Sequence, residues 1–357
     1  MESPITTLEL LRVLDDDGRA ATYPGLPGVP LRLEMFRHML RARRVEERLA
    51  LLQRQGAIGF FGSALGQEAV PVAAALAVTP GDWVFPALRE SAIMLVRGFP
   101  LVAYLAQMFG SARDVQRGRQ MPSHHAARSV RQVSWSSSIG TQLPHAVGMA
   151  LAAARAGDSA IALAFMGEGA TSTPDFHAAL NFAGVFRARV VFVCQNNHYA
   201  LSVPARRQTH AESFAVKALA YGFAGRRVDG NDALAVHRAV AEASAHARAG
   251  FGPTLVECVT YRRGPHSSSD DPSRYRTDAE ERAWAERDPL ARLRRHLTLV
   301  GALAPEDEAA LTAAIDAELG AAVTLAAADP PPARETLFDD VYARPPWHLR
   351  EQGREPA

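Results

Sequence analysis

The sequence lacks the features that mark several classes of protein. It has two cysteines in 357 residues, Cys194 and Cys258, and both lie in apolar stretches, so buried thiols are favoured over a disulfide or a metal pair. Its 39 basic and 38 acidic side chains leave a net charge of +1, which favours neither nucleic acid nor an anionic membrane as a partner. No uncharged run approaches membrane-spanning length, and the N-terminal stretch lacks the basic start and continuous apolar core of a signal peptide. We therefore expect a cytoplasmic protein with no nucleic-acid or membrane partner.

The middle of the chain alternates between strand-like and helix-like patterns. Residues 159–165 and 189–195 are short apolar runs, and the apolar residues between them recur at helical spacing. Thr173 is placed to cap the intervening helix. A later apolar run, residues 254–261, follows an alanine-rich helical segment, residues 233–249. This alternation predicts an α/β fold, a mostly parallel sheet covered by helices on both faces.

The two ends of the chain differ from this alternating region. Residues 1–30 contain a cluster of proline and glycine and are expected to form an N-terminal arm. An amphipathic helical pattern begins at residue 31, and we expect the α/β domain to cover residues 31–282. Residues 283–357 are charged and mostly helical in pattern, which predicts a helical C-terminal extension.

Polar residues follow both of the first two strand-like runs. Glu168 stands between Gly167 and Gly169 after the first run, and Asn196 and Asn197 end the second. Because the carboxyl ends of parallel strands meet at one edge of a sheet, the acid and an asparagine can reach one point. Carboxylate and amide oxygens suit Mg²⁺, which usually also takes oxygens from a substrate phosphate. The pattern therefore predicts Mg²⁺ shared with a phosphorylated ligand, which the glycines would let the backbone approach closely.

Each of these residues also has a plain structural interpretation. Taken alone, Glu168 could be a solvated loop acid, the asparagine pair a turn, and His266 a loop histidine. A dinucleotide-binding loop is another alternative, but the G-x-G-x-x-G pattern is incomplete because Ser172 stands where its last glycine belongs.

The spacing between the two polar groups is more specific. The 26 residues between Gly169 and Asn196 complete a pattern that resembles the diphosphate-binding motif of thiamine diphosphate enzymes. The run GATSxxDFHAALNFA resembles, more narrowly, the α subunit of the decarboxylase component of 2-oxo acid dehydrogenase complexes. The resemblance extends over residues 44–276 through GFFGSALGQEA, ALRESA, GRQMPSH, SSSIGTQLPHAVG and TYRRGPHSSSDDPSRYR. QMPSH and GPHSSSDD resemble the branched-chain (2-oxoisovalerate) type more than the pyruvate type.

The resemblance implies a thiamine diphosphate-binding fold and a thiamine diphosphate-dependent, lipoamide-acylating dehydrogenase. Its substrates would be branched-chain 2-oxo acids such as 3-methyl-2-oxobutanoate, and the acyl group would pass to the lipoyl group of an acyltransferase component. In this family the glutamate that activates the cofactor comes from a separate domain, so we expect a β subunit to supply it, in an assembly of two α and two β chains. A pyruvate dehydrogenase-type α subunit and a catalytically silent structural subunit remain alternatives.

The resemblance also assigns roles to individual residues. Glu168, Asn197 and the carbonyl of Tyr199 would bind Mg²⁺. Arg89 would hold a diphosphate oxygen, which suits its guanidinium. His266 would contact the cofactor and act as the catalytic residue at the reacting centre. The remaining cofactor contacts would come from Ser137, Ile139, Gly167, Gly169 and Ala170.

Further assignments concern the surroundings of the cofactor. A monovalent cation, K⁺, would be held by Ser136, Ser138, Thr141 and Gln142. Phe60 and His124 would lie at the substrate pocket, although a core phenylalanine and a surface histidine pair, His124 with His125, fit the sequence as well. The loop that holds His266 would receive the lipoyl arm and be braced by Arg262, Asp270, Tyr275 and Arg276. Three residues depart from the family pattern and leave the substrate open: Leu88, Trp135 and Pro174. Phosphorylation of Ser267 or Ser268 is also left open.

Overall fold

The fold is built around one parallel β-sheet. The structure, a computed structural model, describes residues 7–21 and 25–354. The six strands of the sheet are β1 (Thr7–Leu11), β2 (Trp83–Phe85), β3 (Ala162–Gly167), β4 (Val190–Asn196), β7 (Ala224–Asp229) and β8 (Thr254–Val259). They lie in the order β1-β7-β8-β4-β3-β2 with every neighbouring pair parallel. A short antiparallel hairpin, β5 (Tyr199–Ala200) and β6 (Val203–Pro204), follows β4.

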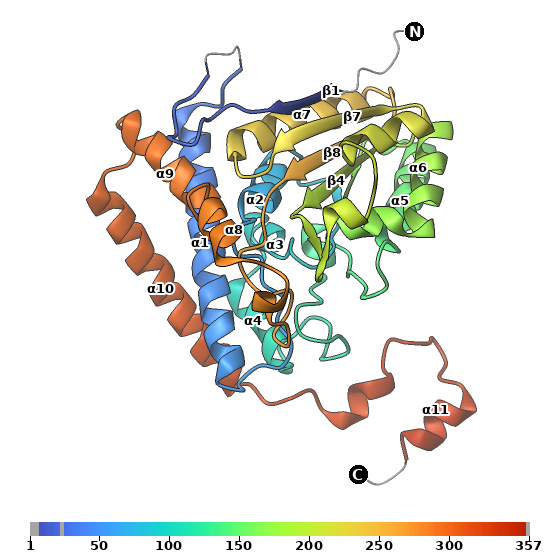
Figure 1. Cartoon of the computed structure of the whole chain (residues 1–357). Helices are drawn as coiled ribbons and strands as arrows, with labels where there is room; N and C mark the ends of the chain where they lie inside the picture. The colour runs from blue at the N-terminus through green and yellow to red at the C-terminus, as the bar shows by residue number, and fades with distance from the viewer. Residues whose placement is uncertain (1–6, 22–24, 355–357) are drawn as a thin grey trace.

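Helices cover both faces of the sheet (Figure 1), as the sequence predicted. On one face α1 (Val29–Arg54), α2 (Ala69–Leu76), α7 (Ala233–Arg248) and α9 (Pro289–Leu299) contribute to one apolar core. On the other face α5 (Gln142–Arg155) and α6 (Pro174–Val185) form a second core. The remaining helices are α3 (Ala92–Val96), α4 (Leu101–Phe109), α8 (Asp278–Ala285), α10 (Pro305–Ala328) and α11 (Trp347–Gln352).

The unit β3-α6-β4 positions the predicted metal ligands. Both strands are almost entirely apolar and buried, as expected for central strands of a parallel sheet. The side chain of Thr173 accepts a hydrogen bond from the Phe176 amide, so it caps α6 as predicted, with Pro174 in the first turn. Gly167 at the end of β3 pairs in register with Gln195 of β4. The residues that follow the two strands therefore emerge side by side.

The N-terminal arm takes part in the sheet through β1, which pairs with β7 at the sheet edge. Asp232 fastens the arm to the start of α7. One oxygen of its buried carboxylate accepts from the amides of Val13 and Leu14, both at 2.6 Å. The other oxygen accepts from the amides of Leu234 and Ala235, which caps α7. One side chain thus satisfies four backbone donors.

We expect the substitution Asp232→Ala to destabilise the protein by about 3 kcal/mol, because it leaves two buried amides of the arm unpaired and removes a helix cap. Chemical denaturation of the two proteins measures this difference. Asp271→Ala is the matched control, since Asp271 caps an exposed turn through the amide of Ser273, and should cost less than about 1 kcal/mol. Equal losses in the two variants would contradict the anchoring role of Asp232.

Within the part of the chain that the structure describes, helix α10 is the one helix long and apolar enough to cross a membrane, by length and composition alone. It lies along α1 on the outside of the protein (Figure 1). Leu319 and Val323 of α10 are buried in a third apolar core, shared with α1 and α4. Arg44 of α1 pairs with Asp316 of α10 at 2.7 Å. These contacts place α10 on the body of the protein.

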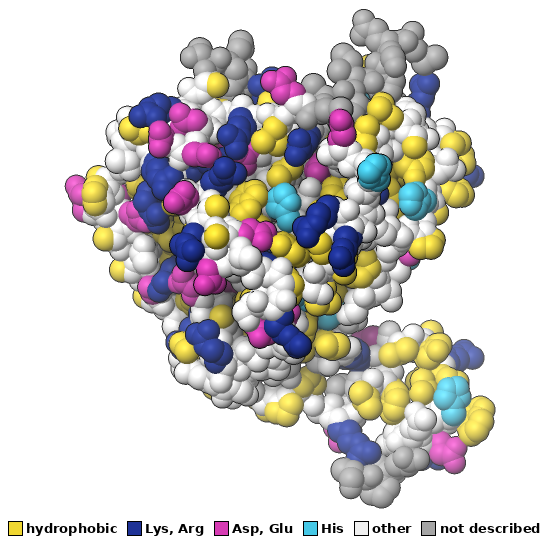
Figure 2. Space-filling view, viewed as in Figure 1, with side chains coloured by type: hydrophobic (Ala, Val, Ile, Leu, Met, Phe, Trp, Pro, Cys, Tyr) yellow, Lys and Arg dark blue, Asp and Glu magenta, His cyan; other side chains and the backbone are white. Residues whose placement is uncertain are grey.

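The surface shown in Figure 2 carries basic and acidic side chains intermixed, in agreement with the near-zero net charge. Examples are the ion pairs of the C-terminal helices: Arg294 of α9 with Glu308 of α10, 2.7 Å apart, and Arg263 of the loop after β8 with Glu281 of α8, 3.1 Å apart.

Candidate functional site

The predicted metal ligands meet where β3 and β4 end. The carboxylate of Glu168 is 1% exposed, and its Oε2 accepts from the amide of Asn197 at 3.3 Å. Its Oε1 is buried and has no hydrogen-bond partner among the described residues. Burial raises the pKa of Glu168 to about 6. The solvated-loop interpretation is therefore wrong, and a buried carboxylate oxygen without a partner is suited to a bound cation.

The two neighbouring asparagines have different roles. Asn196 uses both ends of its amide for bracing, because Oδ1 accepts from the His198 amide at 3.2 Å and Nδ2 donates to Glu257 at 2.8 Å. The backbone N–H of Asn197 donates to Glu168, so this residue lies beside the carboxylate. Its side-chain Nδ2 donates to Gln67 at 3.0 Å, and its Oδ1 accepts one bond of 3.3 Å from the backbone N–H of Tyr199. A carbonyl oxygen has two lone pairs, so Asn197 keeps acceptor capacity for a cation.

The third predicted ligand, the carbonyl of Tyr199, belongs to the loop that closes over Glu168. This carbonyl accepts from Arg262 at 3.2 Å, and the Tyr199 hydroxyl donates to Glu280 of α8 at 2.9 Å. The loop packs tightly on the segment after Glu168, because a Cβ at Gly169 would lie 2.6 Å from the Cβ of Ala200. Gly169 is therefore required by this packing, whereas Gly167 has open space around it.

The structure brings Arg89 and His266 together, although 177 positions separate them in the sequence. Nη2 of Arg89 donates to the His266 carbonyl at 3.1 Å and lies 3.3 Å from its Nδ1. Nη1 of Arg89 is buried without a partner among the described residues. Burial, followed by the neighbouring Arg262, lowers the pKa of Arg89 to about 10, so it stays cationic near neutral pH. A buried cation with an open donor is suited to a phosphate oxygen.

The predicted braces hold the His266 loop. Oδ2 of Asp270 accepts from the His266 amide and from the Tyr275 hydroxyl, both at 2.6 Å. Arg262 donates to the Tyr275 hydroxyl at 2.8 Å. Burial, followed by Arg89 and Arg262, lowers the pKa of His266 to about 4. Because Nδ1 of this neutral ring faces the Arg89 donor, the ring proton is on Nε2.

A second group of predicted residues surrounds His124. Its Nδ1 lies 3.1 Å from the Pro122 carbonyl and its Nε2 lies 3.3 Å from the Ser137 hydroxyl. The His124 ring stacks on the Trp135 ring with their centroids 3.9 Å apart, and the centroid of the Phe60 ring lies 6.3 Å from that of His124. His124 and His125 are both buried, so the surface-pair interpretation is wrong. The departure at Trp135 now has a physical role, because its indole fixes the plane of the His124 ring.

The predicted K⁺ ligands lie on the turn that leads into α5: Ser136 and Ser138 are exposed, whereas Gln142, the first residue of α5, is buried. The Thr141 hydroxyl donates to the Ser138 carbonyl at 2.9 Å, and the Ser138 amide donates to the Ser136 hydroxyl at 3.1 Å. Gln142 donates through Nε2 to the Phe165 carbonyl at 2.8 Å, which leaves Oε1 as its acceptor. Together with His124, these side chains line an open cleft of about 450 Å³, although Ser138 stands outside its lining. Ile139 in the same turn is 59% exposed.

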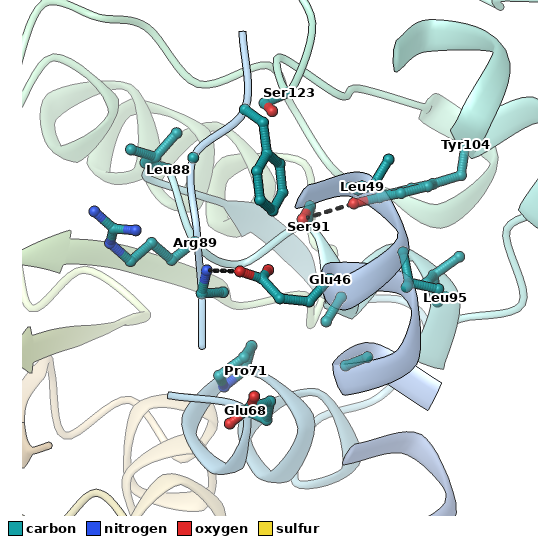
Figure 3. A pocket seen from close by; sticks show the side chains of 16 residues that line it. Glu46, Leu49, Glu68, Pro71, Leu88, Arg89, Ser91, Leu95, Tyr104 and Ser123 are labelled. Atoms are coloured by element: carbon teal, nitrogen blue, oxygen red, sulfur yellow. Dashed lines mark hydrogen bonds between the residues drawn. The ribbon is translucent and has the colours of Figure 1, made fainter. Parts of the chain in front are cut away.

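A small cavity of about 30 Å³, large enough for about one water molecule, lies behind Arg89. Figure 3 shows Glu46 reaching into it from α1, with Leu88 on another wall. Glu46 accepts from the Ser63 hydroxyl at 2.5 Å and the Ala64 amide at 3.0 Å, and burial raises its pKa to about 7. Leu88 packs against Gly62, where an added Cβ would lie 2.6 Å from Leu88 Cδ1.

The sequence analysis missed two buried residues of the site, Gln67 and Glu90, and the partly buried Glu46. Gln67 contacts Asn197, as described above. Glu90 accepts from the Arg89 amide at 3.2 Å and from Gln195 at the end of β4, and so ties the Arg89 loop to the sheet. Burial raises the pKa of Glu90 to about 7. Gln67 and Glu90 stand inside the family-like segments GFFGSALGQEA and ALRESA, which was the available signal.

The sequence of this chain is similar to those of known proteins over most of its length. The family model described as "Dehydrogenase E1 component" matches residues 36–335. The chain is 40% identical over 355 residues to the 2-oxoisovalerate dehydrogenase subunit alpha of Pseudomonas aeruginosa, covering 97% of this chain and 86% of that protein. It is 37% identical over 351 residues to the human mitochondrial 2-oxoisovalerate dehydrogenase subunit alpha, covering 98% and 79%. It is 43% identical over 298 residues to the 3-methyl-2-oxobutanoate dehydrogenase subunit alpha of Mycobacterium tuberculosis, covering 81% and 77%.

Proposed function

The chain belongs to the dehydrogenase E1 component family, and from that premise we propose that it is the α subunit of a branched-chain 2-oxo acid dehydrogenase. Its cofactor is thiamine diphosphate, and it works with a β subunit in a larger complex. Relatives named for 2-oxoisovalerate and 3-methyl-2-oxobutanoate align with most of the chain, which favours the branched-chain function over the pyruvate type and over a silent subunit. The observation that carries the cofactor site is the buried Glu168 oxygen without a partner beside Asn197.

The finer proposal is that Mg²⁺ accompanies the cofactor. Oε1 of Glu168, Oδ1 of Asn197 and the Tyr199 carbonyl would be its protein ligands, and diphosphate oxygens would complete the shell. Nη1 of Arg89 would donate to the diphosphate, which gives that buried donor its partner. K⁺ would bind at the turn formed by Ser136, Ser138, Thr141 and Gln142, where hydroxyl and amide oxygens gather.

The residues of this chain would position the cofactor and donate protons, whereas the cofactor itself would carry the electrons. When bound, thiamine diphosphate would supply the nucleophilic carbon and take up the electron pair of the carbon–carbon bond that breaks when CO₂ leaves. His266 is neutral and holds its proton at Nε2, so it can donate a hydrogen bond to an oxygen near the reacting centre. The Arg89 contact orients this ring, and the Asp270 brace holds the backbone that carries it.

An exposed apolar surface and the family's activating glutamate, which comes from a separate domain, support the proposed partners. The exposed Ile139 beside the His124 cleft suits a surface that a β subunit covers. That subunit would supply the glutamate for the aminopyrimidine ring, in an assembly of two α and two β chains. The acyl group would pass to the lipoyl group of an acyltransferase component at the His266 loop, and we place the complex in the cytoplasm.

Release of CO₂ by the chain purified with its β partner tests the proposed function. The assay uses a dye as electron acceptor and compares 3-methyl-2-oxobutanoate with pyruvate, each with and without thiamine diphosphate and Mg²⁺. We expect turnover that requires both additions, favours the branched acid and is absent from the α chain alone. Preference for pyruvate would contradict the substrate, and turnover without thiamine diphosphate would contradict the function.

A further inference from the structure

In the described structure, Asn197 forms hydrogen bonds with Glu168, with Tyr199 of its own loop and with Gln67, which comes from a different part of the chain. Gln67 precedes α2, 130 positions from Asn197 in the sequence, and it is 0% exposed. Its Oε1 accepts from Nδ2 of Asn197 at 3.0 Å. Its own Nε2 is buried without a partner among the described residues. A buried amide that satisfies its neighbour and leaves its own donor open is not placed there for stability alone.

The hydrogen-bond pattern fixes which end of each amide faces which partner. The Tyr199 backbone N–H is a donor 3.3 Å from Asn197 Oδ1. Turning the Asn197 amide over would bring its NH₂ group against that N–H, so Oδ1 stays on the Tyr199 side. Nδ2 then faces Gln67, and Gln67 can meet it only with Oε1. The two amides therefore lock each other in one orientation.

We propose that Gln67 is a positioning residue that keeps the oxygen of Asn197, and not its nitrogen, available to Mg²⁺. This inference rests on the proposed function, because it assumes the metal site at Glu168 and Asn197. An amide in the reversed orientation would present N–H donors to the cation, and Mg²⁺ accepts only oxygen ligands readily in such sites. Partners of metal ligands set affinity in this way in other proteins.

Gln67 can hold Asn197 because its own segment is fixed on both sides. The backbone N–H of Gln67 donates to the Ala64 carbonyl at 3.0 Å. The side chain of the next residue, Glu68, accepts from Arg43 of α1 at 2.5 Å. Thr260, after β8, donates to the Gly66 carbonyl at 3.3 Å. The backbone of Thr260 in turn donates to the Asn196 carbonyl at 2.9 Å. The segments that carry Gln67 and Asn197 are thus joined through backbone as well as side chain.

The test uses the complex purified with its β partner and three variants. Gln67→Met keeps the length of the side chain and removes the acceptor, whereas Gln67→Glu keeps an oxygen for Nδ2 of Asn197. Gln107→Met is the matched control, since Gln107 is also buried and its Nε2 donates to the Met121 carbonyl at 2.7 Å. The measured quantity is the Mg²⁺ concentration that gives half-maximal binding of thiamine diphosphate, with thermal stability recorded for each protein.

We expect Gln67→Met to raise this Mg²⁺ concentration about tenfold or more, with full cofactor binding restored at saturating Mg²⁺. Gln67→Glu should stay within about threefold of the wild type, because the acceptor remains. Gln107→Met should lose stability and keep the wild-type Mg²⁺ dependence. A Gln67→Met complex with wild-type Mg²⁺ dependence would overturn the inference and leave the proposed function intact. A wild-type complex that binds thiamine diphosphate without any Mg²⁺ dependence would instead overturn the metal site itself.

Discussion

Replacing Glu168 by alanine weakens binding of thiamine diphosphate in the presence of Mg²⁺ by about 100-fold and removes nearly all turnover. The reason is that the substitution deletes the carboxylate ligand that the two strand ends present in a buried position. The remaining predicted ligands are an amide oxygen and a backbone carbonyl, which are neutral. Calorimetric titration of the cofactor into the α and β complex, with Mg²⁺ present, measures the loss.

Glu168 should strengthen cofactor binding but destabilise the complex when the cofactor is absent. The pKa of Glu168 is raised above its usual value, so its ionised form is less stable in the folded protein than in the unfolded chain. The stability of the empty complex should therefore fall as pH rises from the unfolded value of about 4.3 through the folded value of about 6. Glu168→Gln should reduce this dependence, with the part due to Glu46 and Glu90 remaining because their pKa values are raised as well, and should raise the melting temperature at pH 8 without cofactor. Glu212→Gln, at an exposed acid, should change neither property, and a similar effect of both variants would rule out a specific role for Glu168.

Replacing His266 by alanine lowers transfer of the acyl group to lipoamide by about 10³-fold. The ring lies against Arg89 at the predicted reacting centre, on a backbone that Asp270 holds, and its Nε2 proton is the donor that the variant loses. Cofactor binding should weaken less than tenfold, because Arg89 and the metal ligands remain.

Two acceptors separate the roles of His266. Turnover with a dye acceptor, which bypasses the lipoyl group, should fall less than turnover with lipoamide. His210→Ala, at an exposed histidine, is the control and should be fully active. Equal losses with both acceptors would mean that His266 serves decarboxylation and not acyl transfer, and unchanged turnover would remove it from the site.

The parts of the fold that the sequence predicted are those with strong local patterns. Strands β3 and β4 are continuous apolar runs, and Thr173 with Pro174 marks the start of α6. Strand β2 is apolar but has only three residues, too few to show a periodic pattern, and β7 carries two arginines in the sequence AGRRVD, which obscure its apolar pattern. Their pairing depends on neighbours that are distant in the sequence.

The residues of the site also differ in whether the sequence could predict them. Glu168 and Asn197 were predictable because a fixed spacing and two strand ends define them. Gln67, Glu90 and Glu46 approach the same region from other loops and from α1, and each acts through tertiary contacts that leave no periodic signal in the sequence. The stacking of His124 on Trp135 likewise depends on a fold that brings two loops together.

The central claim is that Glu168, Asn197 and the Tyr199 carbonyl hold one Mg²⁺ together with the diphosphate. Electron paramagnetic resonance of the complex loaded with Mn²⁺ and thiamine diphosphate tests it most directly, because a metal bound to phosphate oxygens shows hyperfine coupling to phosphorus. We expect phosphorus coupling in the wild-type complex and its loss in Glu168→Ala. Mn²⁺ bound without phosphorus coupling, or coupling that survives in Glu168→Ala, would contradict it.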